Sequence, residues 1–179
     1  MNRSIAAAAA GLVLAASAQA ALKPGTQAPL FSAQATLAGQ PFAFSLAAAL
    51  KNGPVVLYFY PEAFTPGCTV EAHEFAEASD KFKALGATVI GVSHDGIEKL
   101  NRFSVSECRS KFTVAADEDL KITKSYDAVL KMEPQYADRT SYVIEPGGKI
   151  IYEYTAMSPE KHVSNTLAAV QKWAAAQKH

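Results

Sequence analysis

The chain has 179 residues, a length typical of one domain, and its lysines and arginines equal its aspartates and glutamates at 17 each. Its hydrophobic content of 49% is ordinary for a globular protein. A neutral chain without a basic cluster argues against nucleic-acid binding.

Residues 1–20 have the organisation of a secretory signal peptide. Arg3 supplies a positive charge, residues 5–16 form an alanine-rich apolar stretch, and Ala18-Gln19-Ala20 is a small-x-small cleavage site. The apolar stretch is too short for a membrane span, although an uncleaved anchor stays open as the alternative. We therefore expect cleavage after Ala20, a single mature domain at residues 21–179 with no membrane segment, and a periplasmic location.

The first part of the mature chain predicts a β-hairpin followed by a short helix. Residues 31–36 and 41–44 are the two candidate strands, and they flank a turn at Leu37-Ala38-Gly39-Gln40. Ser45 is then a candidate N-cap for a short helix that ends near Leu50.

The central stretch of the chain joins a buried strand to an amphipathic helix. Residues 55–60 are apolar, β-branched and aromatic, which is typical of a buried strand, and Pro61 ends this run because proline cannot donate to a ladder. Within residues 72–85, apolar side chains recur at spacings of three and four, as in a helix with one buried face.

Cys68 falls in the predicted first turn of that helix. Thr65 suits the N-cap, and Pro66 suits the first helical position. Unpaired amides and the positive end of the helix dipole favour a thiolate there, and the thiolate is the nucleophilic form of cysteine. The alternative is a small buried residue that packs the helix onto a sheet, but the cap and the first-turn position favour the reactive cysteine.

Strands and helices alternate in the rest of the chain. We expect strands at residues 88–92, 112–115, 140–145 and 149–154, and helices at 97–110, 119–126 and from a Ser158 cap with Pro159 at the first position to about 175. This order predicts an α/β fold with a mixed central sheet and helices on both faces.

The stretch Pro61-x-x-x-Thr65-Pro66-Gly67-Cys68-Thr69-x-Glu71 resembles the active-site signature of the peroxiredoxins, and is most similar to the bacterioferritin comigratory protein/PrxQ subfamily. Residues 87–93, 116–119 and 139–144 also resemble that subfamily, in the same order. The resemblance runs from about Leu22 to the last helix, and it implies a thioredoxin-like fold of the peroxiredoxin type.

The resemblance implies a thiol peroxidase that reduces hydrogen peroxide and organic hydroperoxides. Cys68 would be the peroxidatic cysteine, which becomes a sulfenic acid. Thr65 would hydrogen-bond the peroxide, Arg139 would stabilise the thiolate and donate to the peroxide, and Pro61 would shield the pocket from water. Electrons would come from a thioredoxin-like or other thiol reductant, with no metal, flavin or haem.

The residues alone leave simpler explanations open for these positions. Thr65 would serve as a cap only, Pro61 as a strand terminator only, and Arg139 as a surface ion-pair partner of Glu71 or Asp138. Only the resemblance brings Arg139 to Cys68.

Cys108 is the only other cysteine. Many PrxQ-type proteins have a resolving cysteine five residues after the peroxidatic one, where this chain has His73, whereas other relatives place it on the helix that matches residues 97–110. The resemblance therefore implies a Cys68–Cys108 disulfide, which would require local unfolding. An inert Cys108 with an external thiol stays open. We expect His73 to be a solvated helix residue, since the histidines show no metal-ligand spacing.

Two other functions remain as alternatives. A thioredoxin-like thiol–disulfide oxidoreductase is disfavoured by the lack of a Cys-x-x-Cys motif. A non-enzymatic exported binding domain would hold a permanent Cys68–Cys108 disulfide. The resemblance further implies a monomer or a weak dimer, and the sequence does not name the reductant or the preferred peroxide.

Overall fold

The computed structural model describes residues 21–177, so the predicted signal peptide at residues 1–20 lies outside the described residues. The elements follow the predicted order. They are β1 (Ser32–Leu37), β2 (Gln40–Ser45), α1 (Leu46–Leu50), β3 (Val55–Phe59), α2 (Pro66–Ala84), β4 (Thr88–Ser93), α3 (Ile97–Ser106), β5 (Thr113–Ala116), α4 (Lys121–Ser125), β6 (Thr140–Ile144), β7 (Ile150–Thr155) and α5 (His162–Ala176). None of these helices has the length and apolar character needed to cross a bilayer.

The strands form one mixed sheet in the order β2-β1-β5-β4-β3-β6-β7. β3 pairs in parallel with β4, and β4 pairs in parallel with β5, whereas the other pairs are antiparallel. The hairpins β1–β2 and β6–β7 lie at the two edges of the sheet, which confirms both predicted hairpins. Every residue of β3 and β6 is buried, as expected for central strands of a sheet with both faces covered.

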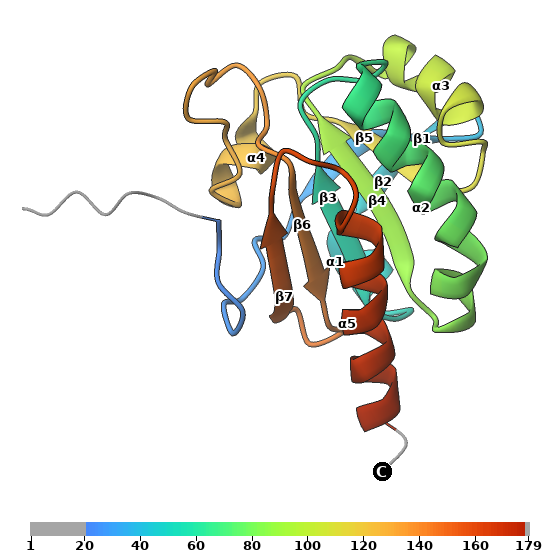
Figure 1. The fold of residues 1–179 in the computed structure, drawn as a ribbon, viewed down its shortest axis with the longest axis vertical. Helices are drawn as coiled ribbons and strands as arrows, with labels where there is room; N and C mark the ends of the chain where they lie inside the picture. Colours follow the sequence, from blue (N-terminus) through green and yellow to red (C-terminus); the bar gives the residue numbers. More distant parts are fainter. Residues whose placement is uncertain (1–20, 178–179) are drawn as a thin grey trace, which may run out of the picture.

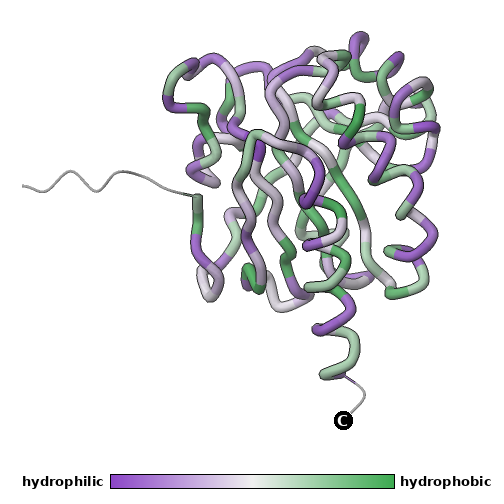
Figure 2. Tube along the Cα trace, in the orientation of Figure 1, coloured by the Kyte–Doolittle hydropathy of each residue, from purple (hydrophilic) through white to green (hydrophobic). Residues whose placement is uncertain are grey.

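Alternate residues of β3 point to opposite faces of the sheet. Val56 and Tyr58 pack in the cluster that contains apolar residues of α2, α3 and α5. Val55, Leu57 and Phe59 pack in the second cluster, which contains residues of α1 and α4. Figure 1 shows α2 and α5 in front of the sheet, and Figure 2 shows hydrophobic residues along the central strands and hydrophilic residues recurring along α2. The predicted two-sided α/β architecture is therefore present.

Helix α3 is shorter than its amphipathic pattern predicts. It ends at Ser106 instead of Ser110, because Arg109 and Ser110 adopt left-handed backbone conformations with φ of 49° and 57°. The amide of Cys108 still donates to the carbonyl of Phe103 at 3.0 Å. Cys108 therefore lies just beyond the helix.

Two other helix starts also differ from the prediction. α5 begins at His162, and the hydroxyl of Ser158 donates to the Glu160 carboxylate at 2.8 Å instead of capping the helix. α4 begins at Lys121, since Leu120 before it is left-handed with φ of 56°. In both places a local side-chain or backbone preference replaces the expected first turn.

Candidate active site

The start of α2 places Cys68 in the first helical turn, as the sequence predicts. Thr65 is the N-cap residue and Pro66 occupies the first turn. The Thr65 hydroxyl, however, makes no capping bond, and donates instead to the carbonyl of Glu62 at 2.9 Å. Cys68 itself is only 2% exposed, so the thiol lies at the base of the helix start, shielded from bulk water.

The guanidinium of Arg139 contacts the sulfur of Cys68. Its Nη2 donates to Sγ at 3.4 Å, and Arg139 is 3% exposed. Arg139 immediately precedes β6, so the sheet brings it beneath the start of α2. Gly67 leaves room for this approach, because a Cβ there would lie 3.2 Å from Nη2. Arg139 does pair with Glu71, as one alternative supposed, but the pair is buried instead of lying at the surface. Its Nη2 is a charge-assisted donor that can stabilise a Cys68 thiolate.

Arg139 is held by partners on its other nitrogens. Nη1 pairs with the carboxylate of the buried Glu71, and Nε donates to the carbonyl of Met157 at 2.9 Å. Burial alone lowers the pKa of Arg139, but the neighbouring Glu71 and Cys68 raise it above its ordinary value, so the side chain stays cationic. The planar guanidinium of Arg139 is thus held in place with its Nη2 directed at the Cys68 sulfur.

Glu71 and His162 form a buried layer behind Arg139. Burial raises the pKa of Glu71 to about 8, although the charge of Arg139 offsets part of this effect. Burial lowers the pKa of His162 to about 4, and the Arg139 charge acts in the same direction. His162 Nδ1 lies 3.7 Å from Glu71 Oε1, while its Nε2 lies 2.8 Å from the Ala156 carbonyl. A carbonyl only accepts, so His162 is neutral with its proton on Nε2.

The loop that leads into α2 is tied to the start of α3. Asp95 is 4% exposed, and its Oδ2 accepts from the backbone amide of Ala63 at 2.7 Å. Lys99 Nζ lies 2.6 Å from Asp95 Oδ1 and 2.7 Å from Glu62 Oε1. Burial by itself lowers the pKa of Lys99, but the two carboxylates raise it above its usual value. Neither Asp95 nor Lys99 belongs to the Cys68 signature, so their sequence positions alone did not mark them as site residues.

Glu62, His94 and Asp95 form the one group within residues 21–177 with several potential metal-ligating atoms. Their ligand atoms lie within 4.8 Å of one another. The ammonium of Lys99 contacts both carboxylates of this group. The donor set is therefore that of an ion-pair network, in which the lysine already offsets one of the two negative charges.

Cys108 is a fully buried free thiol. Its exposed fraction is 0%, and both cysteines are unpaired. Burial raises the pKa of Cys108 well above its ordinary value, and the nearby Glu107 raises it further, so the side chain is a neutral thiol at rest. Its segment must move before Cys108 can act as a nucleophile.

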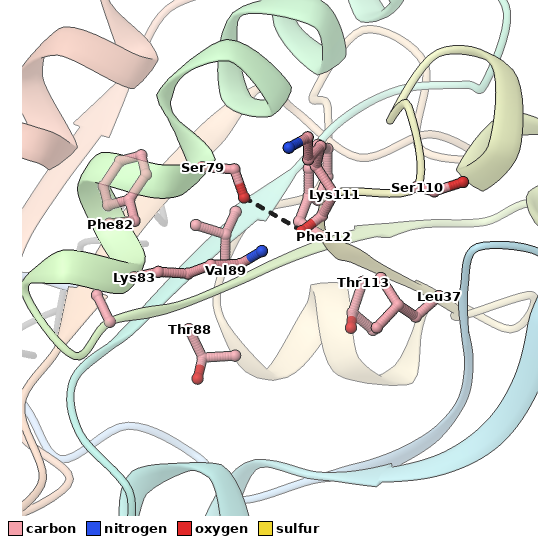
Figure 3. A pocket seen from close by; sticks show the side chains of 11 residues that line it. Leu37, Ser79, Phe82, Lys83, Thr88, Val89, Ser110, Lys111, Phe112 and Thr113 are labelled. Atoms are coloured by element: carbon pink, nitrogen blue, oxygen red, sulfur yellow. Dashed lines mark hydrogen bonds between the residues drawn. The ribbon is translucent and has the colours of Figure 1, made fainter.

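The segment that contains Cys108 is fastened to α2. His73 lies on α2 with its side chain 35% exposed, so it is partly solvated as predicted, but its Nε2 also lies 2.8 Å from Glu107 Oε2, a contact that was not predicted. The hydroxyl of Ser79 donates to the carbonyl of Lys111 at 3.1 Å (Figure 3). A pocket of about 230 Å³ lies between α2 and this segment, and neither cysteine lines it. Figure 3 shows the side chains that line this pocket.

Comparison with known sequences identifies the family. Residues 24–153 match the AhpC/TSA family. A chloroplastic peroxiredoxin Q from Triticum aestivum is 38% identical over 122 residues, which cover 68% of this chain and 56% of the relative. The peroxiredoxin Bcp of Bacillus subtilis is 32% identical over 127 residues, which cover 68% of this chain and 80% of the relative. The match thus spans little more than half the length of the plant relative.

Solved structures agree with this assignment. The peroxidoxin BcpB of Mycobacterium tuberculosis superposes with a TM-score of 0.76 at 26% identity, over 84% of this chain and 97% of that one. A peroxiredoxin Q of Xanthomonas campestris has a TM-score of 0.71 at 23% identity, over 80% and 91% of the two chains, and shares the fold. The expected thioredoxin-like architecture is confirmed. The chain belongs to the AhpC/TSA family and, within it, to the peroxiredoxins of the Q/Bcp type.

Proposed function

We propose that this protein is a thiol-dependent peroxidase that reduces hydrogen peroxide and organic hydroperoxides at Cys68. The observation that carries the proposal is the 3.4 Å contact between Arg139 Nη2 and Cys68 Sγ at the start of α2. A buried arginine and free helix amides favour a thiolate where a peroxide would meet it. The curated relatives are named peroxiredoxins, which supports the same activity.

In the proposed reaction, the Cys68 thiolate attacks one peroxide oxygen. The S–O bond forms as the O–O bond breaks, so sulfur is oxidised to the sulfenic acid and the peroxide is reduced. The released oxygen takes up a proton and leaves as water or alcohol. Arg139 stabilises the negative charge as it moves from sulfur to oxygen, Thr65 binds the peroxide, and Pro61 limits the entry of water.

Cys108 is the proposed resolving cysteine. Its thiol attacks the Cys68 sulfenic acid, forms a Cys68–Cys108 disulfide and releases water, and a thioredoxin-like or other dithiol reductant then restores both thiols. The position of Cys108 beyond the end of α3 supports the proposal, because a helix end unwinds more easily than its middle. Resolution by an external thiol, with Cys108 inert, is the competing route.

The proposed site of action is the periplasm, after removal of residues 1–20. The support is the signal-like sequence of that stretch. Export in a bacterial host followed by intact mass of the product tests it: cleavage after Ala20 is expected, whereas an unprocessed membrane-bound chain would contradict it. The proposed mature protein is a monomer or a weak dimer, which sedimentation across a concentration series measures.

The main test is peroxide consumption by residues 21–179 with dithiothreitol, followed by intact mass and peptide mapping. We expect turnover, its loss in Cys68→Ser, and a two-hydrogen mass loss from a Cys68–Cys108 cross-link. Turnover with only a sulfenic acid on Cys68 would contradict the resolving role of Cys108. Insulin reduction without peroxide consumption, or no turnover from a folded protein, would contradict the peroxidase itself.

A further inference from the structure

We propose that Asp95 is a positioning residue for peroxide capture, which acts by fixing the Glu62–Ala63 peptide and, through it, the hydroxyl of Thr65. The inference rests on the proposed function, in which Cys68 reacts with a peroxide that Thr65 binds. Asp95 is separated in sequence from the Cys68 signature, and it acts on the loop that precedes α2.

One peptide unit, that between Glu62 and Ala63, makes hydrogen bonds on both sides. Its N–H, from Ala63, donates to Asp95 Oδ2 at 2.7 Å. Its carbonyl, from Glu62, accepts the Thr65 hydroxyl at 2.9 Å. Asp95 therefore sets the orientation of the Glu62–Ala63 peptide plane. The carbonyl at the other edge of this plane determines the direction in which the Thr65 hydroxyl proton points.

This orientation determines whether the Thr65 hydroxyl donates or accepts a hydrogen bond when a ligand binds. A hydroxyl has one proton to donate and two lone pairs to accept. Because the proton is committed to the Glu62 carbonyl, the Thr65 oxygen can only accept from a ligand in front of Cys68. A hydroperoxide has an O–H that can donate to this oxygen. Arg139 supplies the complementary donor from the other side.

The loop needs such a tether because it contains a strained residue. Phe64, between Ala63 and Thr65, has φ of 71°, a left-handed conformation that is costly for a bulky side chain. Strain of this kind persists only where neighbouring contacts hold the backbone in place. The Asp95 bond to Ala63 provides one such contact, and the Phe64 ring packs edge-to-face on Phe103 at 5.2 Å to provide another.

Helix α3 and the residues just before it supply all of these contacts from one side. Asp95, Lys99 and Phe103 follow one another at intervals of four residues. Lys99 holds the second oxygen of Asp95 at 2.6 Å and also binds the Glu62 side chain. The Asp95 carboxylate is thus fixed before it receives the Ala63 amide, which suits a positioning role.

The test separates peroxide capture from general reactivity of the sulfur. In Asp95→Ala we expect kcat/KM for peroxide to fall by about 10- to 100-fold, the effect of losing a buried hydrogen bond to a charged group. The rate of Cys68 alkylation by iodoacetamide should stay within about twofold of wild type, because Arg139 and the helix start are unchanged. Asp95→Asn keeps an oxygen acceptor and should recover most of the lost kcat/KM.

A double-mutant cycle with Thr65 tests the route of the effect. Thr65→Val should lower kcat/KM for peroxide, and adding Asp95→Ala to it should cause little further loss if Asp95 acts through Thr65. Asp119→Asn is the matched control, since Asp119 is an exposed aspartate paired with Lys121, and it should behave as wild type. Should Asp95→Ala fail to fold, Lys99→Met supplies the same comparison with a smaller expected loss.

The outcomes distinguish this inference from the proposed function. The inference would be overturned if the losses of kcat/KM in Asp95→Ala and Thr65→Val multiply in the double variant, or if the rate of Cys68 alkylation falls in parallel with kcat/KM in Asp95→Ala. Either result would make Asp95 a purely structural residue. Turnover in Cys68→Ser, or a Thr65→Val enzyme with unchanged kcat/KM, would overturn the proposed chemistry on which it rests.

Discussion

The Nη2 of Arg139 lies 3.4 Å from the Sγ of Cys68, although the two residues are 71 positions apart in the sequence. The contact exists because β6 pairs with β3, and β3 leads directly into the loop before α2. Register errors in this strand pair would move the arginine away from the sulfur. The reactivity of Cys68 therefore depends on the centre of the sheet as much as on its own helix.

Replacement of Arg139 should reveal this dependence. In Arg139→Lys, a single ammonium cannot reproduce the three fixed donor directions, and we expect the rate constant of Cys68 oxidation by peroxide to fall by about 100-fold or more. Rapid-mixing kinetics of the reduced protein measures this effect. Arg109→Lys, at an exposed arginine paired with Glu77, is the control and should leave the rate constant unchanged.

Gly67→Ala should separate activity from stability. A Cβ at this position would meet Arg139 Nη2 at 3.2 Å and push the guanidinium from the sulfur, so we expect about a tenfold slower reaction with peroxide. Alanine is the better helix former by about 1 kcal/mol, so thermal stability should hold or rise. A matching loss of stability and rate would show that the substitution damages the helix start rather than the contact.

Glu71→Gln should change how stability depends on pH. The folded-state pKa of Glu71 is raised from 4.5 to about 8 by burial, so the folded protein holds this proton longer than the unfolded chain does. The contribution of the protonated Glu71 carboxyl to the free energy of unfolding is fully present below pH 4.5 and is lost as the pH rises through about 8. Urea unfolding at pH 5 and pH 9 should show a smaller decline for Glu71→Gln than for wild type.

The exposed Glu77 offers the control for that comparison, because Glu77→Gln should decline with pH as the wild type does. An identical decline in Glu71→Gln and wild type would mean that Glu71 does not titrate in this range.

Loosening the contact between His73 and Glu107 should expose Cys108. Glu107→Gln weakens a partly buried charged hydrogen bond, worth about 0.5–1.5 kcal/mol, so alkylation of Cys108 by a thiol reagent should accelerate about 2- to 10-fold. Mass mapping of the modified peptides measures it. Asp80→Asn removes only a 3.9 Å pair with Lys111 and should have no comparable effect. Equal rates in both variants would place the barrier to opening elsewhere.

The sequence was sufficient where chemistry follows from local spacing. Thr65, Pro66 and Cys68 have the predicted places at the helix start, because the preference of proline for the first helical turn is a local signal, although the Thr65 hydroxyl makes no capping bond. The two edge hairpins and the element order were also predictable, since turn residues and apolar periodicity are local signals.

Side-chain contacts between residues far apart in the sequence could not be predicted from residue spacing. His162 and Met157 complete the surroundings of Arg139, yet neither is near Cys68 or Arg139 in the chain, and both are placed by the packing of α5 and the loop before it. The end of α3 was missed for a different reason. The helical periodicity continues past Ser106, but two consecutive left-handed residues terminate the helix, and no glycine marks that position.

Helix α3 connects both halves of the proposed cycle. At its start, Asp95 and Lys99 hold the loop that presents Thr65, and immediately beyond its end lies Cys108. Its 10 residues set these two ends about 15 Å apart. Unwinding can therefore begin at the Cys108 end of α3 while its first turn still holds the loop that presents Thr65. In the proposed cycle, Cys68 is then returned to its reduced form without any rearrangement of the loop that binds the next peroxide.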